Sequence, residues 1–268
     1  MTTPTHGVGR KALVATLALT GLGGCDFDTK LAPRVELDIV VDASGIVEHD
    51  NDLGYHIELT RCRVALADIE LTTDGEMHAS LGQRALDGIH DFFVPSAYAH
   101  PGHAAGGEIV GELPGRFVFD WREDGRVLGL ATMLVANYSG ANFGLSRAEA
   151  TDGLDPDDPI IGHTFDIAGT ATLDGVTVTF EVVLDQDEGR QIIGVPLDLT
   201  VDEDTEEAIG LSLAIVDPVE SDTVFDGVDF HALDDDADGH VVLVPETEAY
   251  NRVRRQLQAH DHYLTQVR

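Results

Sequence analysis

Residues 165–180, FDIAGTATLDGVTVTF, contain the clearest indication of the fold. Apolar residues alternate with polar or small ones on both sides of Asp174-Gly175, and Asp-Gly between two alternating runs predicts a β-hairpin. Apolar runs of strand character, many with the same period of two, recur at 35–39, 57–71, 117–119, 127–138, 197–201, 209–215 and 240–244. About ten strands joined by turns rich in Gly and Asp predict a mainly β fold, an antiparallel β-sandwich or barrel over residues 34–268.

Two segments interrupt this pattern. Residues 76–115 have no clear strand periodicity and contain seven glycines, so we expect a long loop insertion, which in a compact domain is usually functional or disordered. Residues 246–268 have apolar positions at helical spacing and predict a C-terminal helix. The polar side of this helix carries Arg252, Arg254 and Arg255. We expect it to dock against the acidic body, the alternative being a solvated helix face.

The charge balance excludes several classes of function. The 268 residues contain 16 Lys and Arg against 49 Asp and Glu, a net charge of −33. Such a chain lacks the cationic surface that nucleic acids and anionic lipids require, so neither is an expected partner. The acidic runs at 152–158 and 202–207 have no ligand spacing and are interpreted as solvated loops. No P-loop, nucleophile elbow, zincin or dinucleotide motif is present, and we do not expect an enzyme.

The N-terminus has the features of an export signal. Arg10 and Lys11 precede a short apolar run that is too short to span a bilayer. The run ends in Leu22-Gly-Gly-Cys25, which resembles the lipobox of bacterial lipoprotein precursors. The resemblance implies a signal peptide at 1–24, lipidation of Cys25 and a tether at 25–33. The alternatives are an ordinary secretory peptide and a chance cysteine. On the first interpretation the protein is anchored in the bacterial cell envelope, because two or more acyl chains hold a protein firmly at a membrane.

Lipidation of Cys25 would leave Cys62 as the single free thiol. An intramolecular disulfide is then excluded, so the exported domain must be stable without one. Cys62 lies in a stretch of strand character, and we expect a buried, inert side chain rather than a reactive or metal-binding one.

Five of the twelve histidines are candidate ligands for copper or zinc. His100-Pro-Gly-His103 favours a type II turn, whose outer residues are close enough to share a cation. Zinc normally takes at least three protein ligands, so further ones are needed. His163 has the parity of a core-facing strand position, His260 lies on the apolar helix stripe, and His262 is second choice to His260. The alternative is an exposed turn and hydrogen-bonded core histidines.

An acidic loop near the C-terminus is a weaker candidate for calcium. Asp234, Asp236 and Asp238 stand at alternate positions before a glycine, as at the start of a calcium-binding loop. Pro245 occupies the position of the final EF-hand glutamate, and a predicted strand replaces the second helix. We therefore expect a calcium-binding turn of another kind or a solvated acidic turn.

Residues 63–71, RVALADIEL, with Asp-Gly at 74–75, resemble a strand motif of the methanobactin-associated periplasmic copper-binding proteins. The matching positions are Arg63, Asp68 and Leu71. Ala65 occupies a position that is usually aromatic in that family, and the similarity covers about a dozen residues. The resemblance implies a β-rich exported protein that binds copper through histidines.

These features lead to two main hypotheses about function, with an enzyme of unknown type as the third and last. In the first, a cell-envelope lipoprotein binds a transition metal, copper or zinc, through a histidine cluster and stores, senses or transfers the ion. In the second, the lipoprotein is structural or binds another envelope protein, residues 76–115 form the recognition surface, and the histidines have no shared role.

Overall fold

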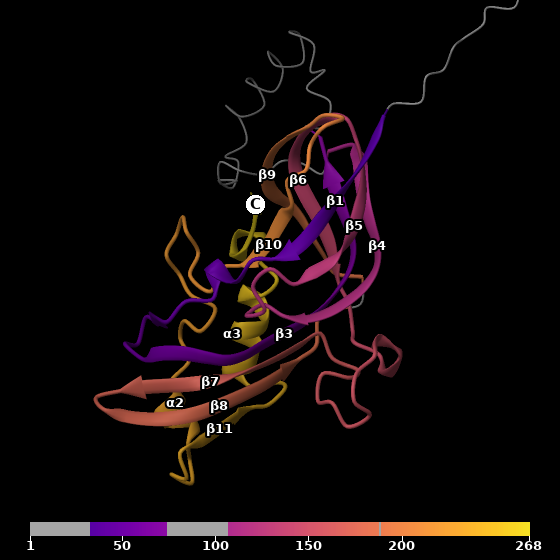
Figure 1. Cartoon of the computed structure of the whole chain (residues 1–268). Helices are drawn as coiled ribbons and strands as arrows, with labels where there is room; N and C mark the ends of the chain where they lie inside the picture. Colours follow the sequence, from indigo (N-terminus) through magenta and orange to yellow (C-terminus); the bar gives the residue numbers. More distant parts are fainter. Residues whose placement is uncertain (1–32, 74–106, 188) are drawn as a thin grey trace, which may run out of the picture. The chain divides into compact units, whose positions relative to one another are not determined.

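A computed structural model describes residues 33–73, 107–187 and 189–268, all within one compact unit that starts at Ala32 (Figure 1). The fold is mainly β, as the sequence predicts. No helix in the described part of the chain is both long and apolar enough to cross a membrane.

The described residues contain twelve strands and a few short helices. The strands are β1 (Arg34–Val41), β2 (His49–Asp50), β3 (His56–Thr72), β4 (Ile109–Asp120), β5 (Val127–Leu134), β6 (Ala136–Leu145), β7 (Phe165–Leu173), β8 (Val176–Leu184), β9 (Gln191–Val201), β10 (Ile209–Leu213), β11 (His240–Leu243) and β12 (Tyr263–Val267). The helices are α2 (Phe230–Leu233), α3 (Glu248–Gln256) and the 3-10 turns η1 (Ala43–Gly45), η2 (Ala150–Asp152) and η3 (His260–His262).

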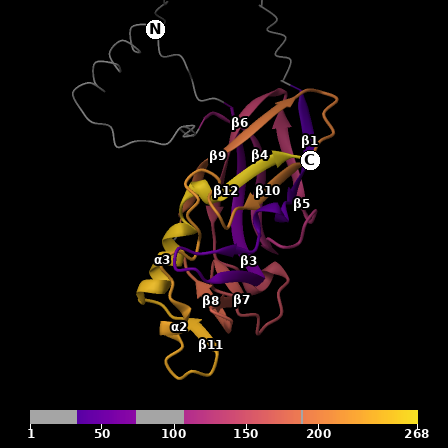
Figure 2. The same ribbon diagram turned by 90° about the vertical axis from the view of Figure 1, so that its left-hand side faces the viewer.

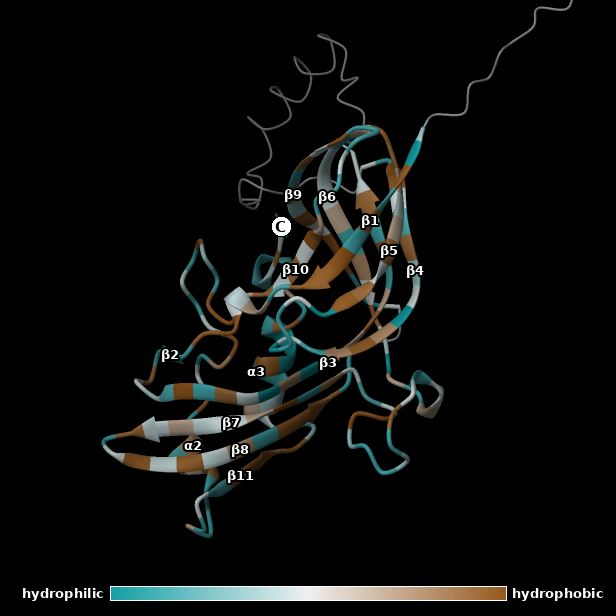
Figure 3. Cartoon of the chain, in the orientation of Figure 1, coloured by the Kyte–Doolittle hydropathy of each residue, from teal (hydrophilic) through white to brown (hydrophobic). Residues whose placement is uncertain are grey.

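The hairpin predicted from residues 165–180 is present. β7 and β8 pair antiparallel from Phe165 opposite Leu184 to Leu173 opposite Val176. Asp174 and Gly175 have φ values of 52° and 78°, and two positive φ values are the signature of a tight type I′ turn. Figure 3 shows the resulting alternation of hydrophobic and hydrophilic residues along these strands.

The long strand β3 organises the sheet. Its first half, from His56 to Val64, pairs with β7, and its second half, from Leu66 to Thr72, pairs with β6. On the opposite edge β3 pairs with β2 at its start and with β4 from Arg63 onward. The strand therefore belongs to two groups, one continuing through β7, β8 and β11, the other containing β4, β5, β1, β10, β12, β6 and β9.

The second group bends round a shared core without closing into a barrel. Its terminal strands β9 and β12 have no ladder between them, although Thr265 Oγ1 donates to the carbonyl of Pro196 across the gap. Pro196 has no N–H to offer to a neighbouring strand. Phe119, Trp121 and Tyr263 are fully or almost fully buried between these strands. Cys62 is buried as predicted, and this burial raises the pKa of its thiol.

Two parallel pairs correct the prediction of an antiparallel fold. β1 runs parallel to β10, and β11 runs parallel to β8, so the sheet is mixed. Alternation along a strand gives the buried face but says nothing about the direction of a neighbour.

The C-terminal helix is shorter than predicted. Thr247 caps α3 by accepting a hydrogen bond from the Tyr250 amide, and the helix ends at Gln256. The remaining residues form η3 and then β12, which pairs antiparallel with β10, and Figure 2 shows these two strands side by side. Residues 263–267 pair with the edge of β10 instead of continuing the helix. The helical spacing of apolar residues gives no sign of this pairing. Of the three arginines expected to dock on the acidic body, Arg254 does so, with Nη2 at 2.6 Å from Asp187, whereas Arg252 pairs with Glu248 within α3.

Two further boundaries differ from the sequence analysis. Ile109 begins β4, so the end of the predicted 76–115 insertion is strand, and residues 74–106 lie outside the described part. The apolar run 127–138 is divided between β5 and β6. The sequence is apolar on both sides of Val135, so hydropathy alone gives no sign of the break between the two strands.

Candidate functional site

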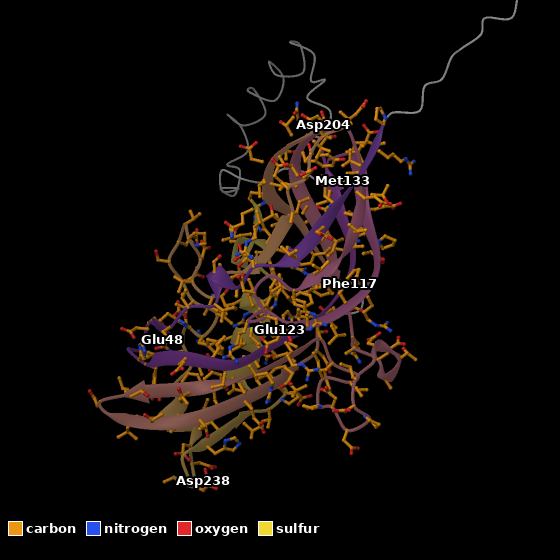
Figure 4. The ribbon with its side chains drawn as sticks, viewed as in Figure 1. Glu48, Phe117, Glu123, Met133, Asp204 and Asp238 are labelled. Carbon is orange, nitrogen blue, oxygen red and sulfur yellow. The ribbon has the colours of Figure 1, made fainter. Side chains whose placement is uncertain are left out.

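The loop after α2 brings together the three carboxylates proposed for calcium. One ligand oxygen from each of Asp234, Asp236 and Asp238 lies within 4.8 Å of the other two. Asp234 is half-buried and the other two are exposed. Figure 4 shows Asp238 at the lower tip of the view, below β11.

Backbone amides orient these carboxylates. The amides of Asp238 and Gly239 donate to Oδ1 and Oδ2 of Asp234, both at 3.1 Å, and the amide of His240 donates to Asp238 Oδ1 at 2.8 Å. Ala237 and Gly239 have φ values of 56° and 79°, which curl the chain tightly. β11 follows at once, where an EF-hand would have a helix. The tight turn therefore places carboxylate oxygens close together, and oxygens are the ligand atoms that a hard cation such as calcium prefers.

A second carboxylate group was missed by the sequence analysis. Ligand oxygens of Asp217, Glu220 and Asp222 also lie within 4.8 Å of one another. Asp217 is 3% exposed and accepts the amides of Val219 and Glu220, and Asp222 Oδ2 accepts Gln256 Nε2 from α3 at 3.0 Å. The spacing of acids in DPVESD, residues 217–222, was the available signal.

His163 lies just before β7 and pairs with an acid. Its Nδ1 lies 2.9 Å from Asp185 Oδ1, and the two side chains are 41% and 39% exposed. The predicted core-facing position is therefore wrong: the side chain lies at the surface, because residue 163 precedes the strand and is not constrained by its alternation. Asp185 fixes the ring through Nδ1, so that Nε2 is the nitrogen available to a further partner.

His260 and His262 lie in η3 rather than on a helix. His260 Nε2 is 2.8 Å from Asp261 Oδ1, and His262 is 1% exposed, with Nδ1 2.8 Å from the carbonyl of Ala214. The preference for His260 as the inward residue is corrected, since His262 is the more buried of the two.

The described histidines do not assemble into a three-residue group. Among residues 33–73, 107–187 and 189–268, the groups of three or more ligand atoms within 4.8 Å contain carboxylates only. His100, His103 and Cys25 lie outside the described residues.

A polar hollow of about 410 Å³ lies where β6 and β8 end and β7 begins. Its lining includes Arg116, Arg147 and Asp187. Arg116 is held by Asp152 and Glu149, and Asp187 by Arg254. Since these charges are already paired within the protein, they do not define the class of a ligand.

The chain was also compared with known proteins: no family model matches it, and neither the curated proteins nor the solved structures contain a match.

Proposed function

We propose that this chain is a lipid-anchored protein of the bacterial cell envelope whose β domain binds calcium at residues 234–239. The observation that carries the calcium proposal is the approach of the Asp234, Asp236 and Asp238 oxygens to within 4.8 Å of one another. The anchor rests on the resemblance of Leu22-Gly-Gly-Cys25 to a lipobox. A chain with net charge −33 is repelled by anionic lipid, so acylation would have to hold it at the membrane.

Calcium fits this loop better than copper or zinc. Three carboxylates brought close together repel one another, and a divalent cation removes this repulsion. Calcium takes six to eight oxygen ligands in flexible geometry, and carbonyls and water can complete such a shell, whereas copper and zinc favour nitrogen or sulfur donors.

The calcium proposal is tested by calorimetric titration of residues 26–268. We expect calcium to bind and to raise the melting temperature of the wild type, because a ligand of the folded state alone stabilises that state. The variant Asp236→Asn/Asp238→Asn should lose both effects. The control Glu203→Gln/Glu206→Gln removes two charges from another acidic turn and should retain them. Equal calcium affinity in both variants would refute the assignment.

A histidine site for copper or zinc is the second candidate, and the observation that favours it is the His163–Asp185 pair. Metal-ligating histidines usually donate their second ring N–H to a carboxylate or carbonyl, and His163 and His262 both have Nδ1 within 2.9 Å of such an acceptor. His100 and His103 would supply the loop ligands and His260 a further one.

Elemental analysis after dialysis tests this candidate. The variant His100→Ala/His103→Ala should retain less copper or zinc than the wild type, and His163→Ala should reduce it further. His56→Ala is the matched control, because it removes a histidine that was not assigned to the site. Equal metal content in all four proteins eliminates the histidine site and leaves a structural or protein-binding lipoprotein as the alternative.

The anchor has its own test. Cells fed labelled palmitate should label the wild type at Cys25, and Cys25→Ser should carry no label. Label on the serine variant contradicts lipidation at this residue.

A further inference from the structure

A hairpin near the start of the domain holds a segment from far along the chain. Residues 47–57, here named the latch hairpin, contain β2 and the beginning of β3, and residues 223–231 form the docked segment. The amide of the Asn51 side chain donates to the carbonyls of Phe225 at 3.1 Å and Val228 at 3.2 Å. Asn51 is 5% exposed, so these bonds are shielded from water.

Further polar contacts fasten the same two segments. The Asp52 amide donates to Asp226 Oδ1 at 3.0 Å, and the Gly227 amide donates to Asp52 Oδ1 at 2.6 Å. Tyr55 donates its hydroxyl hydrogen to Asp229 Oδ1 at 2.6 Å. These hydrogen bonds, each of which makes a modest net contribution when taken alone, act together with aromatic packing. Tyr55 lies edge-on to Phe230, and Phe225 and Phe230 both pack on Phe180 of β8.

His49 lies at the centre of this contact in its neutral form. The side chain is 8% exposed and its ring stacks on Phe225, with centroids 6.1 Å apart. Nδ1 is 3.1 Å from the carbonyl of Val47. Because a carbonyl can only accept, Nδ1 carries the hydrogen and Nε2 is bare. Nε2 is buried and has no hydrogen-bond partner, so a proton added there finds no acceptor.

The charged groups around His49 come from three directions. Asp50 lies on β2, His56 on β3 and Asp226 in the docked segment. Burial is the largest influence and lowers the pKa of His49; the Val47 carbonyl, Asp226 and Asp50 oppose this effect, whereas His56 adds to it. α2 contributes His231, another imidazole with a buried and unpartnered Nε2, edge-on to Tyr55.

We propose that His49 is an acid-sensitive latch: neutral, it holds the docked segment on the latch hairpin; protonated, it leaves Phe225 for water and releases that segment. The sign follows from linkage. A histidine whose pKa is lowered by burial takes up a proton more readily in the open state, so closure is strongest above about pH 6.5 and weakens as the pH falls towards the folded-state pKa. One proton is coupled to opening, so the opening constant rises up to about tenfold per pH unit.

Amide hydrogen exchange at pH 7.5, 6.0 and 5.0, corrected for the intrinsic rate, tests the latch. In the wild type the Asp52 and Gly227 amides should lose protection as the pH falls, whereas amides that pair β6 with β9 should not.

Two variants identify the titrating group. His49→Phe keeps an aromatic ring on Phe225 but cannot be protonated, and its protection should be the same at all three pH values. His56→Gln removes an exposed histidine from the paired strand and should respond like the wild type. Protection that is independent of pH in the wild type, or an equal loss in His49→Phe, overturns the proposal. If His49→Phe does not fold, the pKa of His49 is measured from its NMR resonance in the wild type. A pKa at or above 6.5 also overturns the proposal.

Discussion

The two halves of β3 are held in different ways. From its middle onward, β3 lies in an apolar environment. Trp121 donates its amide hydrogen to the carbonyl of Cys62. Its ring meets Phe119 of β4 and Tyr263 of β12, and Tyr263 meets Phe143 of β6, edge to face or tilted with centroids 4.8–6.3 Å apart. The beginning of β3 adjoins the latch hairpin, where hydrogen bonds from polar side chains and a buried imidazole accompany the aromatic packing of Tyr55 on Phe230. Apolar burial is nearly independent of pH, whereas buried polar groups depend on their protonation state. β3 therefore joins a region whose stability should not depend on pH to a region whose stability should.

The largest expected effect breaks the apolar half. Trp121→Ala should cost about 3–5 kcal/mol, because it leaves a large cavity among strands that are distant in sequence. The indole Nε1 is buried without a partner, so Trp121→Phe should cost less. Urea unfolding measures both, and Val127→Ala, at a 54% exposed position, is the control and should change stability by less than about 0.5 kcal/mol. A Trp121→Ala cost no larger than that of the control contradicts the assignment of this core.

The next effect concerns the polar half. Asn51→Ala should cost about 2–3 kcal/mol, because it leaves the carbonyls of Phe225 and Val228 without their donor in a shielded position. The loss of hydrogen-exchange protection should be confined to the latch hairpin and the docked segment. Asn137→Ala is the matched control, since its side chain makes an exposed bond to Thr200. Loss of protection spread evenly over the sheet contradicts the division into two halves.

Ion pairs at the middle of β3 give a smaller effect that depends on acid. A hydrogen bond from Arg63 is the main cause of the lowered pKa of Asp158, and Arg116 lowers the pKa of Asp152 in the same way. Carboxyls with a lowered pKa stabilise the fold above about pH 3.8, and the contribution is lost as the pH falls through the folded-state pKa. Arg63→Gln should cost about 1–2 kcal/mol at pH 6 and less at pH 3 by urea unfolding. A difference that is independent of pH contradicts this pairing.

The smallest effect concerns the whole acidic surface. Raising NaCl from about 0.05 to 1 M shortens the range of charge repulsion from about 14 to 3 Å. A chain of net charge −33 should gain stability, by less than about 1 kcal/mol, because its self-repulsion weakens. Thermal unfolding measures the shift. A lower melting temperature in high salt would show that the ion pairs of Arg63 and Arg116 outweigh the repulsion.

The comparison also shows where sequence reasoning ends. Residues 152–158 were interpreted as a solvated loop, yet Asp158 makes two hydrogen bonds to Arg63 at 2.7 and 2.8 Å. Asp152 holds Arg116 at 2.8 Å. An acidic run gives no sign of the arginines that another strand will bring to it, so only the sheet register decides which carboxylates are paired.

The candidate site also combines features that are local in the sequence with features that depend on distant elements. Alternation of Asp234, Asp236 and Asp238 is a local property, and the loop brings the three side chains together as the spacing indicates. The group Asp217, Glu220 and Asp222 is also local, but Asp222 contacts Gln256 of α3, which sequence separation conceals. The prediction that His163, His260 and His262 share a site depended on which faces of distant elements meet. The start of β7 and the end of α3 place these residues differently from that prediction.

By itself, the sequence determined the mainly β class, the β7–β8 hairpin, the burial of Cys62 and the closeness of three loop carboxylates. Each depends on residues near one another in the chain, through alternation, turn chemistry or spacing. Tertiary structure alone decided the parallel neighbours of β1 and β8, the strand that replaced the end of the predicted helix, and the packing of His49 on Phe225. These depend on which backbone edges and side chains meet across long separations, because hydrogen-bonding edges and buried polar groups are satisfied by whatever the completed fold supplies.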